Sequence, residues 1–276
     1  MSRVRRMLLA VACGLLLAAG AACDGDGEPG PGPPPTSQSS LSPSASLPPV
    51  GVDCRDLATQ GLTQRLTNAA GLTIAAVEYG SGPMGVVLAH QSDASMCQWL
   101  PYAMRLAEEG YRVVAFDFAG YGASSATESK TYLDDIQTAV SYLRDRGTSR
   151  VVVIGASMGA TMSVVAAAAI TPPLDGLIAV SPPRTFDGVN AERAAVELQT
   201  PALYIAGDDD GDYEVYAGEI NQATPEPLRD LLVVDSPEHG VELVEASTLA
   251  GAEVRAGIDA FLAEHLRPST RPTPTR

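Results

Sequence analysis

Short runs of apolar, often β-branched residues alternate with helical patterns through most of the chain after residue 70. The runs predict strands within residues 72–80, 84–90, 111–120, 150–157, 175–183, 200–210 and 230–240. Apolar residues spaced three or four positions apart predict helices at 97–110, 131–147, 158–170 and 250–266. Because the strand segments do not alternate between apolar and polar residues, they are typical of strands buried on both faces. This order predicts the α/β class, with a mostly parallel, doubly wound sheet of about seven to eight strands and helices on both faces.

Residues 1–22 have the pattern of an export signal. Three arginines among the first six residues form a basic start, and the apolar stretch 7–19 is too short to span a membrane comfortably. The small residues before Cys23 resemble the cleavage site of bacterial lipoproteins, in which this cysteine becomes the first mature residue and carries lipid. We therefore expect lipidation of Cys23 and a place on the outer side of the cell membrane, with plain secretion as the alternative. The basic start fits both the general secretory and the twin-arginine routes.

Residues 23–50 contain mostly Gly, Pro and Ser. Such a segment buries too little apolar surface to offset the entropy of ordering it, so we predict a disordered tether. Residues 267–276, rich in Pro, Thr and Arg, predict a second disordered segment. One folded domain is therefore expected within residues 51–266.

Cys54 and Cys97 are the cysteines of this predicted domain, because Cys13 lies in the signal and Cys23 at the expected lipidation site. Two cysteines in an exported domain favour a disulfide bond. Two unbridged buried thiols are the alternative. The spacing of the cysteines does not indicate a metal site.

The chain is acidic, with a formal net charge of −15 at pH 7, and loss of the basic signal would make it more so. This excess argues against nucleic acid and against polybasic membrane binding. It does not identify a reaction. The sequence lacks the phosphate-loop and dinucleotide-binding motifs, so we expect no nucleotide, flavin or metal cofactor.

Gly155-Ala156-Ser157-Met158-Gly159 joins a predicted strand to a predicted helix. In this context the G-x-S-x-G pattern is typical of a nucleophile elbow. A strand that turns into a helix within a few residues crowds the backbone, and glycines remove the Cβ atoms that would collide. The turn places the serine at a helix N-terminus, where free N–H groups favour a developing negative charge. Ser157 is therefore the candidate nucleophile, and a tight turn without chemistry is the alternative.

With this elbow, residues 70–266 resemble the α/β-hydrolase superfamily, in particular its small esterases and dienelactone hydrolases. The sequence DFAGYGASS at 117–125 is similar to the superfamily's D-x-x-G-x-G-x-S loop, which has a structural role. Lidded relatives insert helices after the sixth strand, but here only residues 181–200 separate two strands. The resemblance therefore implies a minimal lid and an open, shallow site.

The sequence VVLAHQSDASMCQW at 86–99 is similar to the superfamily's oxyanion loop, which usually contains His-Gly. Here His90 is retained and Gln91 replaces the glycine. The resemblance implies that the N–H groups of Ser92 and Met158 bind the oxyanion, with the N–H of Gln91 as a fallback donor. His90 is expected to be a structural hydrogen-bonding residue.

His239 is the candidate general base among three histidines. His90 precedes the elbow and His265 lies on the last helix, whereas His239 follows the last strand, at the carboxyl edge of the sheet. An imidazole suits this role because it can accept and return a proton near neutral pH.

Asp210 is the candidate third member of a catalytic triad. The resemblance implies the order Ser…Asp…His, and the superfamily's Gly-x-x-Asp spacing, counted from Gly207, selects Asp210. Its carboxylate would fix the imidazole tautomer and stabilise the charged ring. An acidic turn that binds a cation such as calcium is a different interpretation. The alternative triad acids are Asp208, Asp209, Asp212 and Asp187.

Together these features predict a serine hydrolase that cleaves carboxylic esters through an acyl-enzyme intermediate and is tethered at the cell envelope. The same triad serves thioesterases, acyltransferases and peptidases, and a binding protein could keep the fold without turnover. The expected partners are a small-molecule or acyl-ester substrate and the membrane, without nucleic acid. The sequence leaves the acyl length and the oligomeric state open.

Overall fold

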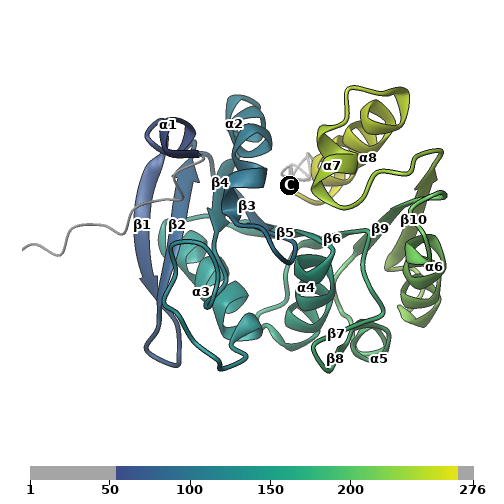
Figure 1. Cartoon of the computed structure of the whole chain (residues 1–276), viewed down its shortest axis with the longest axis horizontal. Helices are drawn as coiled ribbons and strands as arrows, with labels where there is room; N and C mark the ends of the chain where they lie inside the picture. The colour runs from purple at the N-terminus through teal and green to yellow at the C-terminus, as the bar shows by residue number, and fades with distance from the viewer. Residues whose placement is uncertain (1–53, 267–276) are drawn as a thin grey trace, which may run out of the picture. The chain divides into compact units, whose positions relative to one another are not determined.

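A computed structural model describes the structure of residues 54–266 (Figure 1). The expected signal at 1–22, the tether at 23–50 with Cys23, and the tail at 267–276 lie outside these residues. Within 54–266, no helix has the length and hydropathy needed to cross a membrane.

An 8-stranded sheet forms the centre of the domain, in the order β1-β2-β4-β3-β5-β6-β9-β10. Strand β2 is antiparallel to its neighbours β1 and β4, and the other pairs are parallel. This arrangement confirms the predicted mostly parallel α/β sheet. The strands are β1 Leu62–Thr67, β2 Thr73–Tyr79, β3 Met84–Ala89, β4 Arg112–Phe116, β5 Arg150–Ala156, β6 Gly176–Val180, β9 Ala202–Gly207 and β10 Arg229–Val234.

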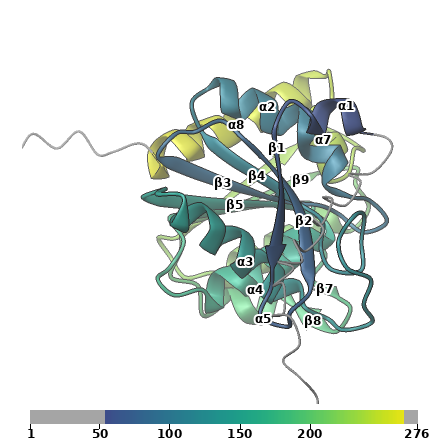
Figure 2. The same ribbon diagram turned by 90° about the vertical axis from the view of Figure 1, so that its left-hand side faces the viewer.

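Helices cover both faces of the sheet (Figures 1 and 2). One face carries α1 Arg55–Ala58, the 3-10 helix η2 Met96–Trp99, α2 Leu100–Glu108, α7 Val241–Glu245 and α8 Leu249–His265. The opposite face carries α3 Tyr132–Asp145, α4 Met158–Ala169, α5 Ala191–Ala195 and α6 Tyr213–Ala223. The central strands are therefore buried on both sides, which explains why their sequences are apolar without alternation.

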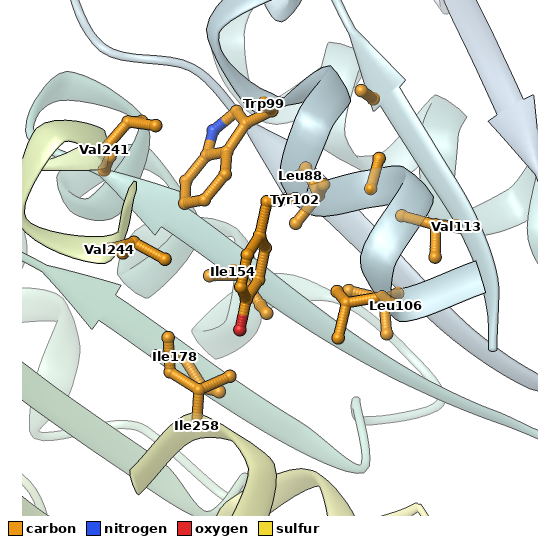
Figure 3. Packing of buried hydrophobic residues seen from close by; sticks show 14 of the residues in the cluster. Leu88, Trp99, Tyr102, Leu106, Val113, Ile154, Ile178, Val241, Val244 and Ile258 are labelled. Carbon is orange, nitrogen blue, oxygen red and sulfur yellow. The ribbon is translucent and has the colours of Figure 1, made fainter. Parts of the chain in front are cut away.

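Each face of the sheet has its own apolar core. On the face of α2 and α8, Trp99 and Tyr102 belong to one cluster with the sheet residues Ile154 and Ile178 and the helix residue Ile258 (Figure 3). Burial of each such large side chain contributes about 1.5–3 kcal/mol. On the other face, α4 is buried almost all round, because it packs on β5 and β6 and is covered by α3 and α5. Its Ala- and Val-rich sequence fits this position.

The chain between β6 and β9 forms only a small excursion from the sheet. It contains the two-residue strands β7 Thr185–Phe186 and β8 Val189–Asn190, which pair with each other, and the short helix α5. The Asn190 side chain caps α5 by accepting a hydrogen bond from the Arg193 N–H, at 2.7 Å. The prediction of a minimal lid is confirmed.

The elements that were not predicted from the sequence include β1, α6 and α7. Strand β1 buries only Leu66, and it exists because it pairs along its length with β2. Helix α6 buries only Ala217 and Ile220, too few apolar residues for a clear helical period. Helix α7 is five residues long. Each is stabilised by contacts with distant segments more than by its own pattern.

Cys54 and Cys97 form a disulfide bond with a Cα–Cα distance of 5.4 Å. The bond links the start of the described domain to η2, which directly follows the segment expected to form the oxyanion loop. The closed loop spans a sequence separation of 43 residues.

The double variant Cys54→Ser/Cys97→Ser should lower the free energy of unfolding by about 2–4 kcal/mol, because the unfolded chain loses a cross-link that limits its entropy. Urea unfolding at pH 7 measures this as a lower midpoint. A reducing agent should lower the midpoint of the wild type similarly and leave that of the double variant unchanged. Equal midpoints for the two oxidised proteins would contradict a stabilising cross-link.

Candidate active site

Ser157 lies in the sharp turn between β5 and α4, with φ 48° and ψ −115°. A positive φ is uncommon for a residue with a Cβ and costs about 1–3 kcal/mol. The turn is held because the Ser157 N–H donates a 2.9 Å hydrogen bond to the carbonyl of Val180 in β6. The side chain is only 7% exposed. Ser157 therefore sits at the carboxyl edge of the sheet, in the backbone strain expected of a nucleophile elbow.

The two glycines of the elbow are required by close packing. A Cβ on Gly155 would lie 2.3 Å from the carbonyl oxygen of Gly159, and a Cβ on Gly159 would lie 2.4 Å from that of Ala89 in β3. Both distances are far below van der Waals contact. The glycines thus allow the first turn of α4 to rest directly on the ends of β5 and β3.

His239 forms a carboxylate–imidazole pair with Asp210. Its Nδ1 lies 2.8 Å from Oδ2 and 3.0 Å from Oδ1 of Asp210, which is 7% exposed. This geometry makes Nδ1–H the donor and leaves Nε2 free to accept a proton. The ring of Tyr213, the first residue of α6, packs on the imidazole with the ring centroids 4.2 Å apart.

The other aspartates weighed from the sequence have different partners. Asp208 accepts a hydrogen bond from the Ser236 N–H, and Asp212 accepts one from the hydroxyl of Tyr216. Asp187 pairs with Lys130, which lowers the pKa of its carboxyl. Asp209 is exposed, and in the part of the chain that the structure describes the His239 ring bonds Asp210 instead. Across residues 54–266 no group of three or more His, Cys, Asp or Glu is placed to hold a metal ion, so the cation interpretation has no support there.

The loop that carries His239 is attached next to the elbow. The Ser181 hydroxyl, one residue beyond the Val180 that binds Ser157, accepts a 3.0 Å hydrogen bond from the N–H of Gly240. A Cβ on Gly240 would lie 3.5 Å from that of Ala156. Among the described residues, however, the hydrogen bonds of the His239 ring go to Asp210, and none joins it to the Ser157 hydroxyl. Such bonds are often long without substrate and tighten when it binds.

The expected oxyanion donors differ in their availability. Met158 is the first residue of α4, and neither its N–H nor that of Ser92 has an acceptor among the described residues. The N–H of Gln91 donates a 3.0 Å hydrogen bond to the side-chain oxygen of Gln98. Gln91 is therefore not free to act as the fallback donor, because its N–H is already bound within the protein.

His90 is part of a buried structural network. Its Nδ1–H donates to the carbonyl of Gln91 at 2.7 Å, and its Nε2 accepts from the Phe118 N–H at 3.1 Å. Burial lowers the pKa of His90 to about 4, so the ring stays neutral near pH 7. His265 lies at the end of α8, where its ring packs on Phe261.

The Asp117 carboxylate supports the loop that follows it. It accepts hydrogen bonds from the N–H groups of Met96, at 2.7 Å, and Ala123, at 2.8 Å. A Cβ on Gly122 would lie 2.2 Å from this carboxylate, which explains the glycine. The D-x-x-G-x-G-x-S segment is therefore a brace that also holds the start of η2, through Met96.

Sequence reasoning missed the side-chain contacts of Gln91 and the parts played by Ser181 and Tyr213. One feature of the sequence pointed to Gln91, because it stands where the superfamily usually has glycine. None pointed to Ser181, since its φ of 47° and its bond to Gly240 depend on the assembled sheet edge.

Comparisons with known proteins agree with this fold. A family model described as "Serine aminopeptidase, S33" matches residues 84–190. An esterase of Pyrococcus furiosus superposes with a TM-score of 0.64 and 19% identity, covering 77% of this chain and 94% of the esterase. The chain therefore has the α/β-hydrolase fold, as the resemblance in its sequence implied.

Two curated proteins match shorter segments. Bifunctional epoxide hydrolase 2 of Sus scrofa is 37% identical over 95 residues, which is 33% of this chain and 17% of that protein. Epoxide hydrolase A of Mycobacterium tuberculosis is 36% identical over 104 residues, which is 36% of this chain and 32% of that protein. The chain thus spans less than a third of the length of each of these relatives.

The lowered pKa of His90 predicts a pH-dependent stability. The unfolded chain binds a proton near pH 6.5 and the folded one near pH 4, so acidification between these values favours unfolding. The free energy of unfolding should fall by about 2–3 kcal/mol from this residue between pH 7 and pH 4.5. Urea unfolding at both pH values should show a smaller fall for His90→Gln, which lacks the titrating ring. His265→Gln is the control, and equal falls for the wild type and His90→Gln would refute the prediction.

Proposed function

We propose that the protein is a serine hydrolase that cleaves carboxylic esters through an acyl-enzyme intermediate. The observation that carries this proposal is the Asp210–His239 pair, whose histidine loop is attached beside the strained turn at Ser157. A binding protein would gain nothing from such strain, whereas a nucleophile elbow uses it to turn the serine hydroxyl out of the end of the strand.

In the proposed reaction, Ser157 Oγ attacks the acyl carbonyl carbon while Nε2 of His239 accepts the hydroxyl proton. The N–H groups of Ser92 and Met158 stabilise the oxyanion. The C–O bond to the alcohol then breaks, and His239 returns the proton to the leaving oxygen. Water repeats the sequence, with His239 as base, and releases the acid and free Ser157. Asp210 holds Nδ1–H throughout and stabilises the charged ring.

Two features favour esters as the substrate class. The esterase of Pyrococcus furiosus superposes over most of this chain. The excursion between β6 and β9 consists of two two-residue strands and one short helix, so this segment lacks the helical lid of larger relatives. The epoxide hydrolase relatives make epoxides the contrasting class in a substrate test.

We also propose that the protein is exported and held at the membrane by lipid on Cys23. The sequence pattern before Cys23 supports this location. The Cys54–Cys97 bond adds support, because structural disulfides persist in oxidising compartments outside the cytoplasm.

A fluorophosphonate probe should label the wild-type protein on Ser157, because it reacts with a serine activated by a base. Ser157→Ala should abolish labelling, and His239→Ala should slow it at least about 10²-fold. Ser149→Ala, which alters an exposed serine before β5, should label like the wild type. In-gel fluorescence with peptide mapping measures the outcome, and an unlabelled wild type would overturn the proposed function.

The substrate class is tested with p-nitrophenyl esters, the matching thioesters and a styrene-type epoxide. We expect the highest kcat/KM for the esters and loss of this activity in Ser157→Ala. Preferred turnover of the thioester would reassign the substrate within the same mechanism. Epoxide opening that survives Ser157→Ala would contradict the serine mechanism.

The Cys23→Ser variant should move the protein from the membrane fraction to the soluble fraction in a bacterial host, because the site of lipidation is lost. Cys13→Ser, within the predicted signal, should leave it in the membrane fraction. Fractionation with immunoblotting and intact-mass analysis provides the measurement. A Cys23→Ser protein that stays membrane-bound would count against the lipid anchor.

A further inference from the structure

We propose that Gln91 is a positioning residue that ties the oxyanion loop to the loop carrying His239. The inference rests on the proposed function, because it assigns Gln91 a part in the same site. Gln91 lies directly before Ser92, the expected oxyanion donor. Its side chain reaches across to the segment that directly follows His239.

All four polar groups of Gln91 are engaged. Its side-chain oxygen accepts a 3.2 Å hydrogen bond from the Val241 N–H, and its side-chain NH2 donates a 3.0 Å bond to Glu242. Its backbone N–H donates to Gln98 and its carbonyl accepts from His90. A residue with every polar group bound is fixed in place, and it also fixes the two segments between which it lies.

The contact with Val241 completes a helix terminus. Helix α7 begins at Val241, and its N-cap residue Gly240 has no side chain to accept the first free N–H groups. The Gln91 oxygen accepts one of them. Gly240 has φ 57°, and a Cβ there would lie 2.3 Å from that same oxygen. A side chain at position 240 would therefore collide with the Gln91 oxygen, which explains the glycine after His239.

Gln91 is itself held by a rigid frame. Gln98, which binds its N–H, lies in η2 beside the disulfide-bonded Cys97. The first residue of η2, Met96, is bound through its N–H by the Asp117 carboxylate. Through Gln91, the His239 loop is thus held by the same part of the domain that holds the oxyanion loop.

This link matters because the reaction needs the imidazole and the oxyanion donors at a fixed separation. Displacement of a catalytic group by about 1 Å can cost about 10²-fold in rate. Ser181 holds the N–H of Gly240 from the sheet side, and Gln91 holds the next N–H from the oxyanion loop. Loss of Gln91 should therefore lower kcat more than it raises KM.

The test compares four variants with the wild type. Gln91→Met keeps the length of the side chain and removes its hydrogen bonds. Gln91→Glu keeps an acceptor for Val241 but places a carboxylate against Glu242. The double variant Gln91→Glu/Glu242→Gln exchanges donor and acceptor and restores the bond at the same net charge. Gln137→Met is the matched control, because Gln137 is a partly buried glutamine on α3 whose side chain, within residues 54–266, bonds Ser141 of its own helix.

We expect Gln91→Met to lower kcat for a p-nitrophenyl ester and the rate of fluorophosphonate labelling by about 10–100-fold, with KM changed less than about 3-fold. The double variant should have a kcat at least about 5-fold higher than that of Gln91→Met. Gln137→Met should match the wild type. Amide hydrogen exchange should be faster in peptides covering residues 239–245 of Gln91→Met. A purely structural role would lower the urea midpoint without the kcat loss or its recovery.

The outcomes separate the two proposals. Unchanged exchange at 239–245 in Gln91→Met overturns the link, whatever the activity. Faster exchange with wild-type kcat and labelling shows a contact without a positioning role, which also overturns the inference. A wild-type protein that the probe does not label defeats the proposed function instead, and the exchange data then still decide whether Gln91 holds the loop.

Discussion

At Ser157 the backbone adopts φ 48° and ψ −115°, a conformation that a residue with a Cβ holds only when its surroundings compel it. Three contacts do so. The Ser157 N–H is bound by Val180 of β6, Gly155 lets the first turn of α4 close over the end of β5, and Gly159 lets that turn rest on β3. The strain of about 1–3 kcal/mol is offset by an α4 buried almost completely between the sheet and its neighbouring helices.

The rest of the site is assembled around this turn by loops at the carboxyl edge of the sheet. Parallel pairing brings the ends of β5, β6 and β9 together, so that Ser157, Ser181 and the Asp210 loop share one edge. The His239 loop is then fixed from two sides, by Asp210 through its ring and by Ser181 and Gln91 through the N–H groups that follow it. The backbone of this loop is thus held by hydrogen bonds, as the His239 ring is held by Asp210.

Each of the two apolar cores supports a different part of the site. The core with Trp99, Val241 and Val244 connects η2 and α7, the two elements that flank the expected oxyanion loop and the His239 loop (Figure 3). The core on the other face carries α4 and hence the elbow. The buried His90, whose pKa burial lowers to about 4, joins the expected oxyanion loop to Phe118 without adding a charge near neutral pH.

The sequence by itself determined the elements whose residue pattern is local, without contributions from distant segments. The apolar runs predicted the buried strands, because a strand covered on both faces has no polar positions to break its run. The glycines around Ser157 predicted the elbow, because only a crowded turn needs them there. The sequence also placed Asp210 and His239 after strands whose carboxyl ends share an edge, and the two are paired in the folded chain.

Tertiary structure alone decided the features that depend on groups far apart in the chain. Strand β1 and helix α6 form because β2 and the sheet supply their partners, since their own sequences bury few residues. The bond from Ser181 to Gly240 and the link from Gln91 to Val241 span 59 and 150 residues, so no local pattern encodes them. A hydrogen bond is directional and short-ranged, and its partners can be identified only once the fold has brought them within about 3 Å of each other.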